Sequence, residues 1–348
     1  MEFDLNTIVR NNIRELRPYS SARSEFSGDG EVWLDANENA FGSPAGDGWN
    51  RYPDPLQTQL KIRLAEINKV SPSQVFIGNG SDEAIDLLFR IFCQPGRDEA
   101  IICPPTYGMY SVSAAINDVC IREVPLTEEF QLDTDAILAA ISEPTKLIFV
   151  CSPNNPTGNC LSLDSITAIA ESFDGIVAVD EAYIHFASQR SMIDGMGRLK
   201  NVVVLQTFSK AWGMAGLRVG MAFADPAIIE LLNRVKPPYN VSGIAQGAVL
   251  NSLSEMTRVD EWIARCVRER EFVASQLKDI QIVETVHPSD ANFLLVKFLD
   301  AKYVYRYLLD AGIVLRDRTS IRGCEGCLRI TIGTTEENRR LLDSLRSI

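Results

Sequence analysis

One lysine of this chain has a setting that suggests chemistry. Lys210 lies in the segment VLQTFSKAWGMAGLRVG, residues 204–220. Hydroxyl side chains at Thr207 and Ser209 precede it, and the guanidinium of Arg218 follows it. Hydroxyls and a guanidinium are suited to bind a phosphate, and a lysine amine can form a Schiff base with a carbonyl. The segment therefore predicts a phosphorylated cofactor that is held covalently.

Four more polar clusters each follow a short apolar run. They are GNGSDE (residues 78–83), CPPTYG (103–108), CSPNNPTG (151–158) and VDEAY (179–183). In an open parallel sheet, ligands bind beyond the carboxyl ends of the strands. If the apolar runs are such strands, these clusters and the Lys210 segment meet at one edge of the sheet.

Each cluster also has a purely structural interpretation. GNGSDE could form only a turn and a helix cap, or a phosphate-binding nest in which Ser81 and Asp82 offer N–H groups at a helix N-terminus. Tyr107 could be a core ring or could stack on a flat ligand. Asp180 is more telling, because a carboxylate after four apolar residues is costly to bury without a partner. Together the clusters offer what pyridoxal phosphate needs: an amine, an acid for the pyridine nitrogen, a stacking ring and a phosphate cup.

The elements that must position these residues follow from hydrophobic periodicity. Runs typical of buried strands occur at residues 75–77, 100–103, 120–124, 147–151, 176–179, 202–205 and 219–224. Helical spacing occurs at 81–92, where Ser81 can cap the start, and at 132–141 and 163–173. Continuous apolar strands joined by helices predict an α/β fold, a three-layer sandwich with a mostly parallel central sheet.

Two parts of the chain depart from this alternation. The N-terminal residues are irregular and rich in turns, and a long helical stretch is expected at 244–277. Strands are then expected at 282–286, 293–298, 313–316 and 328–332, with helices at 303–310 and at the C-terminus. We assign residues 1–40 to an N-terminal arm or lid that packs on the small domain, 41–275 to a large cofactor-binding domain, and 276–348 to a smaller α+β domain.

Composition argues against several other classes of protein. The net charge of -12 disfavours a nucleic-acid partner. The apolar runs are too short to span a bilayer, and the opening residues do not resemble a signal peptide. Eight scattered cysteines indicate reduced thiols in the cytoplasm. Cys324 and Cys327 have metal-like spacing, but the chain has only two histidines and no second close cysteine pair, so we expect no metal site and leave the role of this pair open.

The motifs also resemble a known family. PPTYGMY, SPNNPTG, VDEAY and TFSKAWGMAGLRVG are similar to the pyridoxal-phosphate aminotransferases of the aspartate aminotransferase fold. LRPY, LDANEN, RYPDP and LRITIGT resemble, more narrowly, the histidinol-phosphate aminotransferase family. The likeness runs from about Arg17 to Thr334. One departure is Ala40, where the family commonly has proline, and the loop from there to RYPDP is short.

The resemblance implies roles for the residues that bind the cofactor, pyridoxal 5'-phosphate. Lys210 would bind it covalently and later move a proton between the substrate's α-carbon and the cofactor. Asp180 would pair with the protonated pyridine nitrogen. Asn155 and Tyr183 would hydrogen-bond the ring hydroxyl, and Tyr107 would stack on the ring. The phosphate would lie among Ser81, Asp82, Thr207, Ser209 and Arg218.

The resemblance also implies a substrate pocket and a homodimer. Arg329 would bind the substrate's anionic end with Arg316 beside it, and Tyr19 and Asn37 would line the same pocket. Tyr52 would reach the cofactor phosphate of the partner subunit, so the two subunits would share their active sites.

The reaction implied is amino transfer between glutamate and imidazole acetol phosphate, giving histidinol phosphate and 2-oxoglutarate in histidine biosynthesis. An aromatic amino acid aminotransferase and a threonine-phosphate decarboxylase on the same scaffold would keep the same cofactor residues, so both alternatives stay open. A pyridoxal-phosphate sensor domain fused to a DNA-binding region is disfavoured, because no basic helix-turn-helix segment precedes Arg17.

Overall fold

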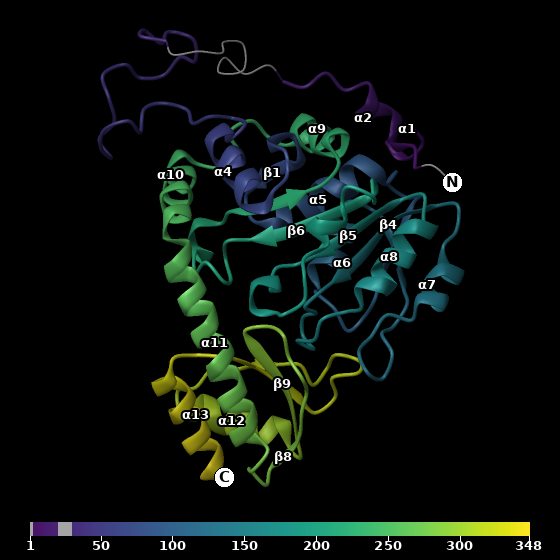
Figure 1. Ribbon diagram of the computed structural model, residues 1–348, viewed down its shortest axis with the longest axis vertical. Helices are drawn as coiled ribbons and strands as arrows, with labels where there is room; N and C mark the ends of the chain where they lie inside the picture. Colours follow the sequence, from purple (N-terminus) through teal and green to yellow (C-terminus); the bar gives the residue numbers. More distant parts are fainter. Residues whose placement is uncertain (1–2, 20–29) are drawn as a thin grey trace.

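A seven-stranded sheet forms the centre of the larger domain in the computed structural model, which describes residues 3–19 and 30–348 (Figure 1). Its strands are β1 (Val75–Gly78), β2 (Glu99–Ile102), β3 (Cys120–Glu123), β4 (Thr145–Cys151), β5 (Ile176–Asp180), β6 (Val202–Thr207) and β7 (Gly220–Phe223). The order is β1-β7-β6-β5-β4-β2-β3, and only β7 runs antiparallel to its neighbours. All strands except β3 are almost wholly buried, which explains why they appear in the sequence as continuous apolar runs.

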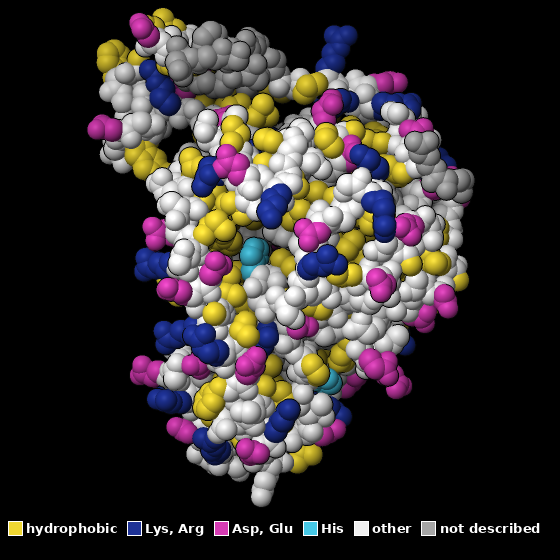
Figure 2. All heavy atoms as spheres, in the orientation of Figure 1, with side chains coloured by type: hydrophobic (Ala, Val, Ile, Leu, Met, Phe, Trp, Pro, Cys, Tyr) yellow, Lys and Arg dark blue, Asp and Glu magenta, His cyan; other side chains and the backbone are white. Residues whose placement is uncertain are grey.

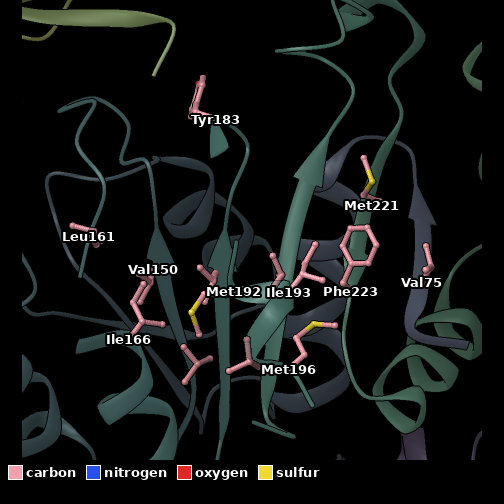
Figure 3. Close-up of a cluster of buried hydrophobic side chains, with 14 of the residues drawn as sticks. Val75, Val150, Leu161, Ile166, Tyr183, Met192, Ile193, Met196, Met221 and Phe223 are labelled. Atoms are coloured by element: carbon pink, nitrogen blue, oxygen red, sulfur yellow. The ribbon is translucent and has the colours of Figure 1, made fainter. Parts of the chain in front are cut away.

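Helices cover both faces of this sheet and confirm the predicted three layers. They are α4 (Thr58–Asn68), α5 (Ser81–Phe92), α6 (Met109–Ile116), α7 (Thr134–Ala140), α8 (Leu163–Ser172), α9 (Pro226–Val235) and α10 (Gly243–Ser252). One core cluster joins the sheet to α4, α7, α8 and α10, and a second joins its other face to α5, α6 and α9. Figure 3 shows part of the first cluster, with Val150 of β4, Ile166 of α8 and Phe223 of β7.

The predicted cap of α5 is wrong in detail. Gly80, not Ser81, is the N-cap residue, and it has φ 79° and no side-chain cap. Glycine adopts this conformation without the steric penalty of a Cβ atom. The first N–H groups of α5 therefore have no side-chain cap from the N-cap residue, as an anion-binding helix N-terminus requires.

A smaller α+β domain follows the long helix α11 (Met256–Leu277), which runs from the large domain into it (Figure 1). Its antiparallel sheet has the order β10-β11-β9-β8. The strands are β8 (Val283–Val286), β9 (Phe293–Phe298), β10 (Arg316–Asp317) and β11 (Cys327–Thr331), and the helices are α12 (Ala301–Asp310) and α13 (Thr335–Arg346). Side chains of α11, α12 and α13 share one core with this sheet.

The single helix expected at 244–277 is interrupted. A 3-10 turn, η5 (Leu253–Glu255), separates α10 from α11. Two serine hydroxyls donate to backbone carbonyls at this point, from Ser252 to Ala248 and from Ser254 to Asn251. Such local bonds compete with regular helix geometry, and periodicity alone does not reveal them.

The N-terminal residues also differ from the expectation of an arm on the small domain. The short helices α1 (Leu5–Ile8) and α2 (Asn11–Arg14) pack on the large domain, where Ile8 and Ile13 join the core cluster of α5 and α9. Residues 30–50 extend away from the body instead (Figure 1), and Phe41 is fully exposed there. Within the described residues, no helix is both long enough and apolar enough to cross a membrane.

Candidate active site

A cleft of about 660 Å³ opens at the carboxyl ends of β4, β5 and β6, between the two domains. Cys151, Asp180 and Thr207, the last residues of these strands, all line it. The cleft brings together most residues that the sequence indicated, from both domains. These are Ser81, Asp82, Tyr107, Asn155, Asp180, Tyr183, Thr207, Ser209, Lys210, Arg218, Arg316 and Arg329.

Asp180 is the buried acid of the cleft, with 3% of its surface exposed. The hydroxyl of Tyr110 donates to its Oδ2 at 2.8 Å, and the Ala182 N–H donates to its Oδ1 at 3.1 Å. Desolvation raises the pKa of Asp180 to about 6, although these two hydrogen bonds act in the opposite direction. A positively charged partner in the cleft would relieve this penalty, so the site is suited to a protonated ring nitrogen.

Lys210 reaches into the same cleft. Its Nζ lies 5.5 Å from the centre of the Tyr183 ring, which in turn packs edge-on against Phe293 of β9. Burial lowers the pKa of Lys210, and the positive charge of Arg329 lowers it further. Both effects favour the neutral amine, which is the form that acts as a nucleophile or a base.

The N-terminus of α5 and the segment that follows β6 form a cup for an anion. Arg218 donates to the Ser209 hydroxyl at 3.4 Å, and it lies 3.6 Å from the Asp82 carboxylate. Thr207 accepts the N–H of Ser209 at 3.1 Å, which fixes the turn. The cup therefore combines a guanidinium, two hydroxyls and a helix N-terminus, which are groups that bind phosphate.

Arginines of the small domain form the opposite wall. Arg329 donates from Nη1 to the Asn155 Oδ1 at 2.6 Å, across the two domains, and its guanidinium lies 5.1 Å from the Phe293 ring centre. Arg316 lies directly opposite it in the β10–β11 ladder. A third arginine, Arg318, also lines the cleft.

Three of the predicted site residues lie outside the cleft. Tyr19 and Tyr52 are exposed, at 75% and 51%, and neither they nor Asn37 line it. Tyr52 stacks on Tyr239, with ring centres 4.5 Å apart, and its N–H donates to Glu38. A single copy of the chain thus does not bring these three residues to Lys210.

Sequence reasoning missed two residues of the site. Tyr110 lies in the first turn of α6, is fully buried and donates a hydrogen bond to Asp180. Arg318 follows Arg316 by two residues, the spacing that puts both side chains on one face of a strand. Strand spacing could have predicted Arg318, but nothing in the sequence indicates that Tyr110 reaches β5.

The comparison with known sequences defines the class of protein. The sequence profile of the family "Aminotransferase class I and II" matches residues 24–345. The chain belongs to this aminotransferase family. It is 51% identical to the histidinol-phosphate aminotransferase of Cytophaga hutchinsonii, with 100% of each chain covered. It is 48% identical to that of Parabacteroides distasonis, with 99% of each chain covered.

Solved structures agree with this assignment. The histidinol-phosphate aminotransferase of Sinorhizobium meliloti, a complex with pyridoxal-5'-phosphate, has a TM-score of 0.79 and 25% identity, covering 90% of this chain and 89% of that one. The L-threonine-O-3-phosphate decarboxylase of Porphyromonas gingivalis has a TM-score of 0.74 and 23% identity, covering 86% of this chain and 90% of that one. The second similarity shows the aspartate aminotransferase fold alone.

Proposed function

We propose that this chain is a histidinol-phosphate aminotransferase that depends on pyridoxal 5'-phosphate. It exchanges an amino group between glutamate and imidazole acetol phosphate, giving 2-oxoglutarate and histidinol phosphate in histidine biosynthesis. The family and the names of its full-length relatives support this proposal. The observation that carries it is the arginine wall, which faces Lys210 across the cleft and suits a substrate with a strongly anionic end.

The residues of the cleft fit the cofactor. A Cβ atom at Gly80 would lie 2.8 Å from Arg218 Nη2, and one at Gly220 would lie 2.1 Å from the Ser81 backbone nitrogen. The cup can close to this size because position 220 is glycine, and the φ of 79° at position 80 also favours glycine. Asp180, Lys210 and Tyr107 surround the space beside the cup.

When bound, pyridoxal phosphate supplies an electron sink for the charge that develops at the substrate's α-carbon. The protein residues then have separate tasks. Asp180 would hold a proton at the pyridine nitrogen, since its carboxylate is fixed by two donors and is otherwise costly to bury. Asn155 and Tyr183 would orient the ring hydroxyl, and Tyr107 would pack on the ring. Lys210 moves a proton to and from the α-carbon as a neutral amine.

The substrate's anionic end binds at the small-domain wall. Arg329 is fixed by Asn155 and Phe293, so its guanidinium is oriented before the substrate arrives. Arg316 stands beside it as the second cation. A guanidinium binds either a carboxylate or a phosphate through paired hydrogen bonds, so one wall can accept glutamate and histidinol phosphate in turn.

We further infer a cytoplasmic homodimer. Tyr52, Tyr19 and Asn37 lie outside the cleft of their own chain, and residues 30–50 extend away from the body, as expected of an arm that reaches a partner's active site. All eight cysteines are free thiols, as expected in a reducing compartment.

Spectra of the two half-reactions test the proposed reaction. Glutamate should convert the bound cofactor to its amine form, and imidazole acetol phosphate should restore the original spectrum in one turnover. We expect kcat/KM for histidinol phosphate to exceed that for phenylalanine by at least tenfold. If phenylalanine matches histidinol phosphate, the aromatic aminotransferase replaces this proposal, and if threonine phosphate releases carbon dioxide, the decarboxylase does.

A further inference from the structure

Three arginines occupy one face of the small-domain sheet. Arg316 lies opposite Arg329 in the antiparallel ladder, and the N–H of Arg318 continues the pairing by donating to the carbonyl of Cys327 at 3.1 Å. Residues two apart on a strand point to the same face, so Arg318 lies on the same side as Arg316, roughly 7 Å further along. Like charges directly opposite one another destabilise a sheet unless an anion compensates them.

No counter-ion is present for this group within residues 3–19 and 30–348. None of the ion pairs there includes Arg316, Arg318 or Arg329. Arg329 has the Asn155 amide oxygen as a hydrogen-bond acceptor, and Arg316 is exposed. Arg318 differs from both, because its side chain is half-buried and its Nε atom is buried with no hydrogen-bond partner.

An unsatisfied buried donor carries a free-energy penalty that a bound acceptor removes. Burial and the neighbouring charges of Arg329 and Arg316 also lower the pKa of Arg318, which is a second sign that its charge lacks compensation. The described part of the chain offers no such acceptor. Arg318 lines the substrate cleft, so a substrate that fills the cleft can bring an acceptor to its guanidinium.

We propose that Arg318 is a third phosphate-binding residue of the substrate pocket, and that it distinguishes phosphorylated substrates from amino acids. This inference rests on the proposed function. Histidinol phosphate carries a CH2–O–phosphate group at the carbon where glutamate carries its α-carboxylate. The phosphate therefore extends two atoms further and has nearly twice the charge at pH 7.

The two substrates use the wall differently for this reason. Arg329 is the one arginine of this wall whose charge lowers the pKa of Lys210, and it satisfies the short α-carboxylate with one guanidinium. The longer phosphomonoester has three oxygens that accept hydrogen bonds, and it reaches past Arg329 to Arg318. A desolvated guanidinium gives a stronger hydrogen bond to such an oxygen than an exposed one does.

The test compares Arg318→Gln with the parent holoenzyme on three amino donors: histidinol phosphate, free histidinol and glutamate. We expect kcat/KM for histidinol phosphate to fall by roughly 10- to 100-fold, mainly through KM, because a charge-assisted hydrogen bond is lost. Values for histidinol and glutamate should change by less than about threefold. Inorganic phosphate, as a competitive inhibitor against glutamate, should bind correspondingly more weakly.

Arg322→Gln is the matched control, since Arg322 is an exposed arginine of the same loop that does not line the cleft. It should leave all four constants unchanged, and Arg318→Lys should restore part of the phosphate preference. Equal losses for all three donors would make Arg318 a structural residue, and unchanged constants would exclude a phosphate contact; either result overturns the inference. If the parent does not react with histidinol phosphate, the proposed function fails, and inhibition by inorganic phosphate still decides the role of Arg318.

Discussion

Two adjacent carboxylates at the end of β5 show how single residues acquire different roles. Asp180 faces the cleft, whereas Glu181 points to the other face of the sheet, as alternation along a strand requires. Glu181 accepts hydrogen bonds from the Ser191 hydroxyl, the Met192 N–H and the Gln206 amide. Desolvation raises the pKa of Asp180 to about 6 and that of Glu181 to about 7. Glu181 thus anchors the loop after β5, and Asp180 remains available to a ligand.

The raised pKa of Asp180 predicts a pH-dependent stability of the cofactor-free protein. The folded state binds this proton more tightly than the unfolded state, so the stabilisation is complete below about pH 4 and is lost as pH rises through 6. Asn cannot ionise, and it keeps the polar contacts of the site. The parent should therefore lose stability relative to Asp180→Asn as pH rises from 4 to 7. The difference between their unfolding free energies, measured in urea, should change by up to ~3 kcal/mol in favour of the variant.

The control for this measurement is Asp174→Asn, at an exposed position before β5. Its difference from the parent should stay constant across the same pH range. If the difference for Asp180→Asn is also constant, the pKa of Asp180 is the same in the folded and unfolded states, and the inferred rise is wrong.

The phosphate cup depends on how closely two elements approach. Gly220 begins β7 and pairs with Gly78 of β1 and Thr207 of β6. A Cβ atom there would meet the backbone of Gly80 and Ser81, at 2.4 and 2.1 Å. The N-terminus of α5 is therefore held directly against the start of β7, next to Arg218.

This contact predicts the effect of Gly220→Ala. The added methyl group must displace the first turn of α5, so the N–H groups of the cup lose their alignment with Arg218. We expect the Kd for pyridoxal phosphate to rise by at least about tenfold, and stability to fall by about 1–3 kcal/mol, as is typical of overpacking. Fluorescence titration and thermal unfolding would measure the two effects.

Gly197→Ala provides the comparison, because a Cβ atom at that exposed glycine has no neighbour within 4 Å. Both its cofactor affinity and its stability should stay near the parent values. A Gly220→Ala protein that is destabilised but binds pyridoxal phosphate normally would show that the cup does not depend on this approach.

The sequence predicts where helices and strands lie better than it predicts strand register and long-range hydrogen bonds. The central strands β4, β5 and β6 are mostly apolar, so these strands and the polar residues at their ends could be located from the sequence. The register of β10 against β11 could not, because only two residues of β10 pair and both are charged. The spacing of Arg316 and Arg318 predicts that they share a face, but that this face lines the cleft depends on the register. The acceptor of the Tyr110 hydroxyl, Asp180, lies 70 residues further along the chain.

At the scale of the whole molecule, residues 30–50 form an arm whose hydrophobic side chains are not covered by the described part of the chain. Val32, Leu34 and Phe41 are 76%, 86% and 101% exposed. Hydrogen bonds hold the arm to the segment that follows it, since the Glu38 carboxylate accepts from the Arg51 guanidinium at 2.6 Å and from the Tyr52 N–H at 2.7 Å. Figure 2 shows it as a separate mass at the upper left, with hydrophobic side chains on its surface. An exposed hydrophobic surface of this kind is typical of a protein–protein interface, and a second copy of the chain would bury it.

A mixed dimer tests whether the arm completes the partner's active site. Lys210→Ala and Tyr52→Ala are first assayed as separate proteins, where we expect almost no activity and strongly weakened cofactor binding, respectively. A heterodimer of one subunit of each, isolated with two different affinity tags, contains one site with both lesions. Its other site combines an intact Lys210 with the intact Tyr52 of the Lys210→Ala subunit. A shared site therefore predicts about half the activity of the parent dimer and half its tightly bound pyridoxal phosphate. If Tyr52 instead serves its own subunit, both sites of the heterodimer are damaged, and no activity beyond that of the Tyr52→Ala protein returns.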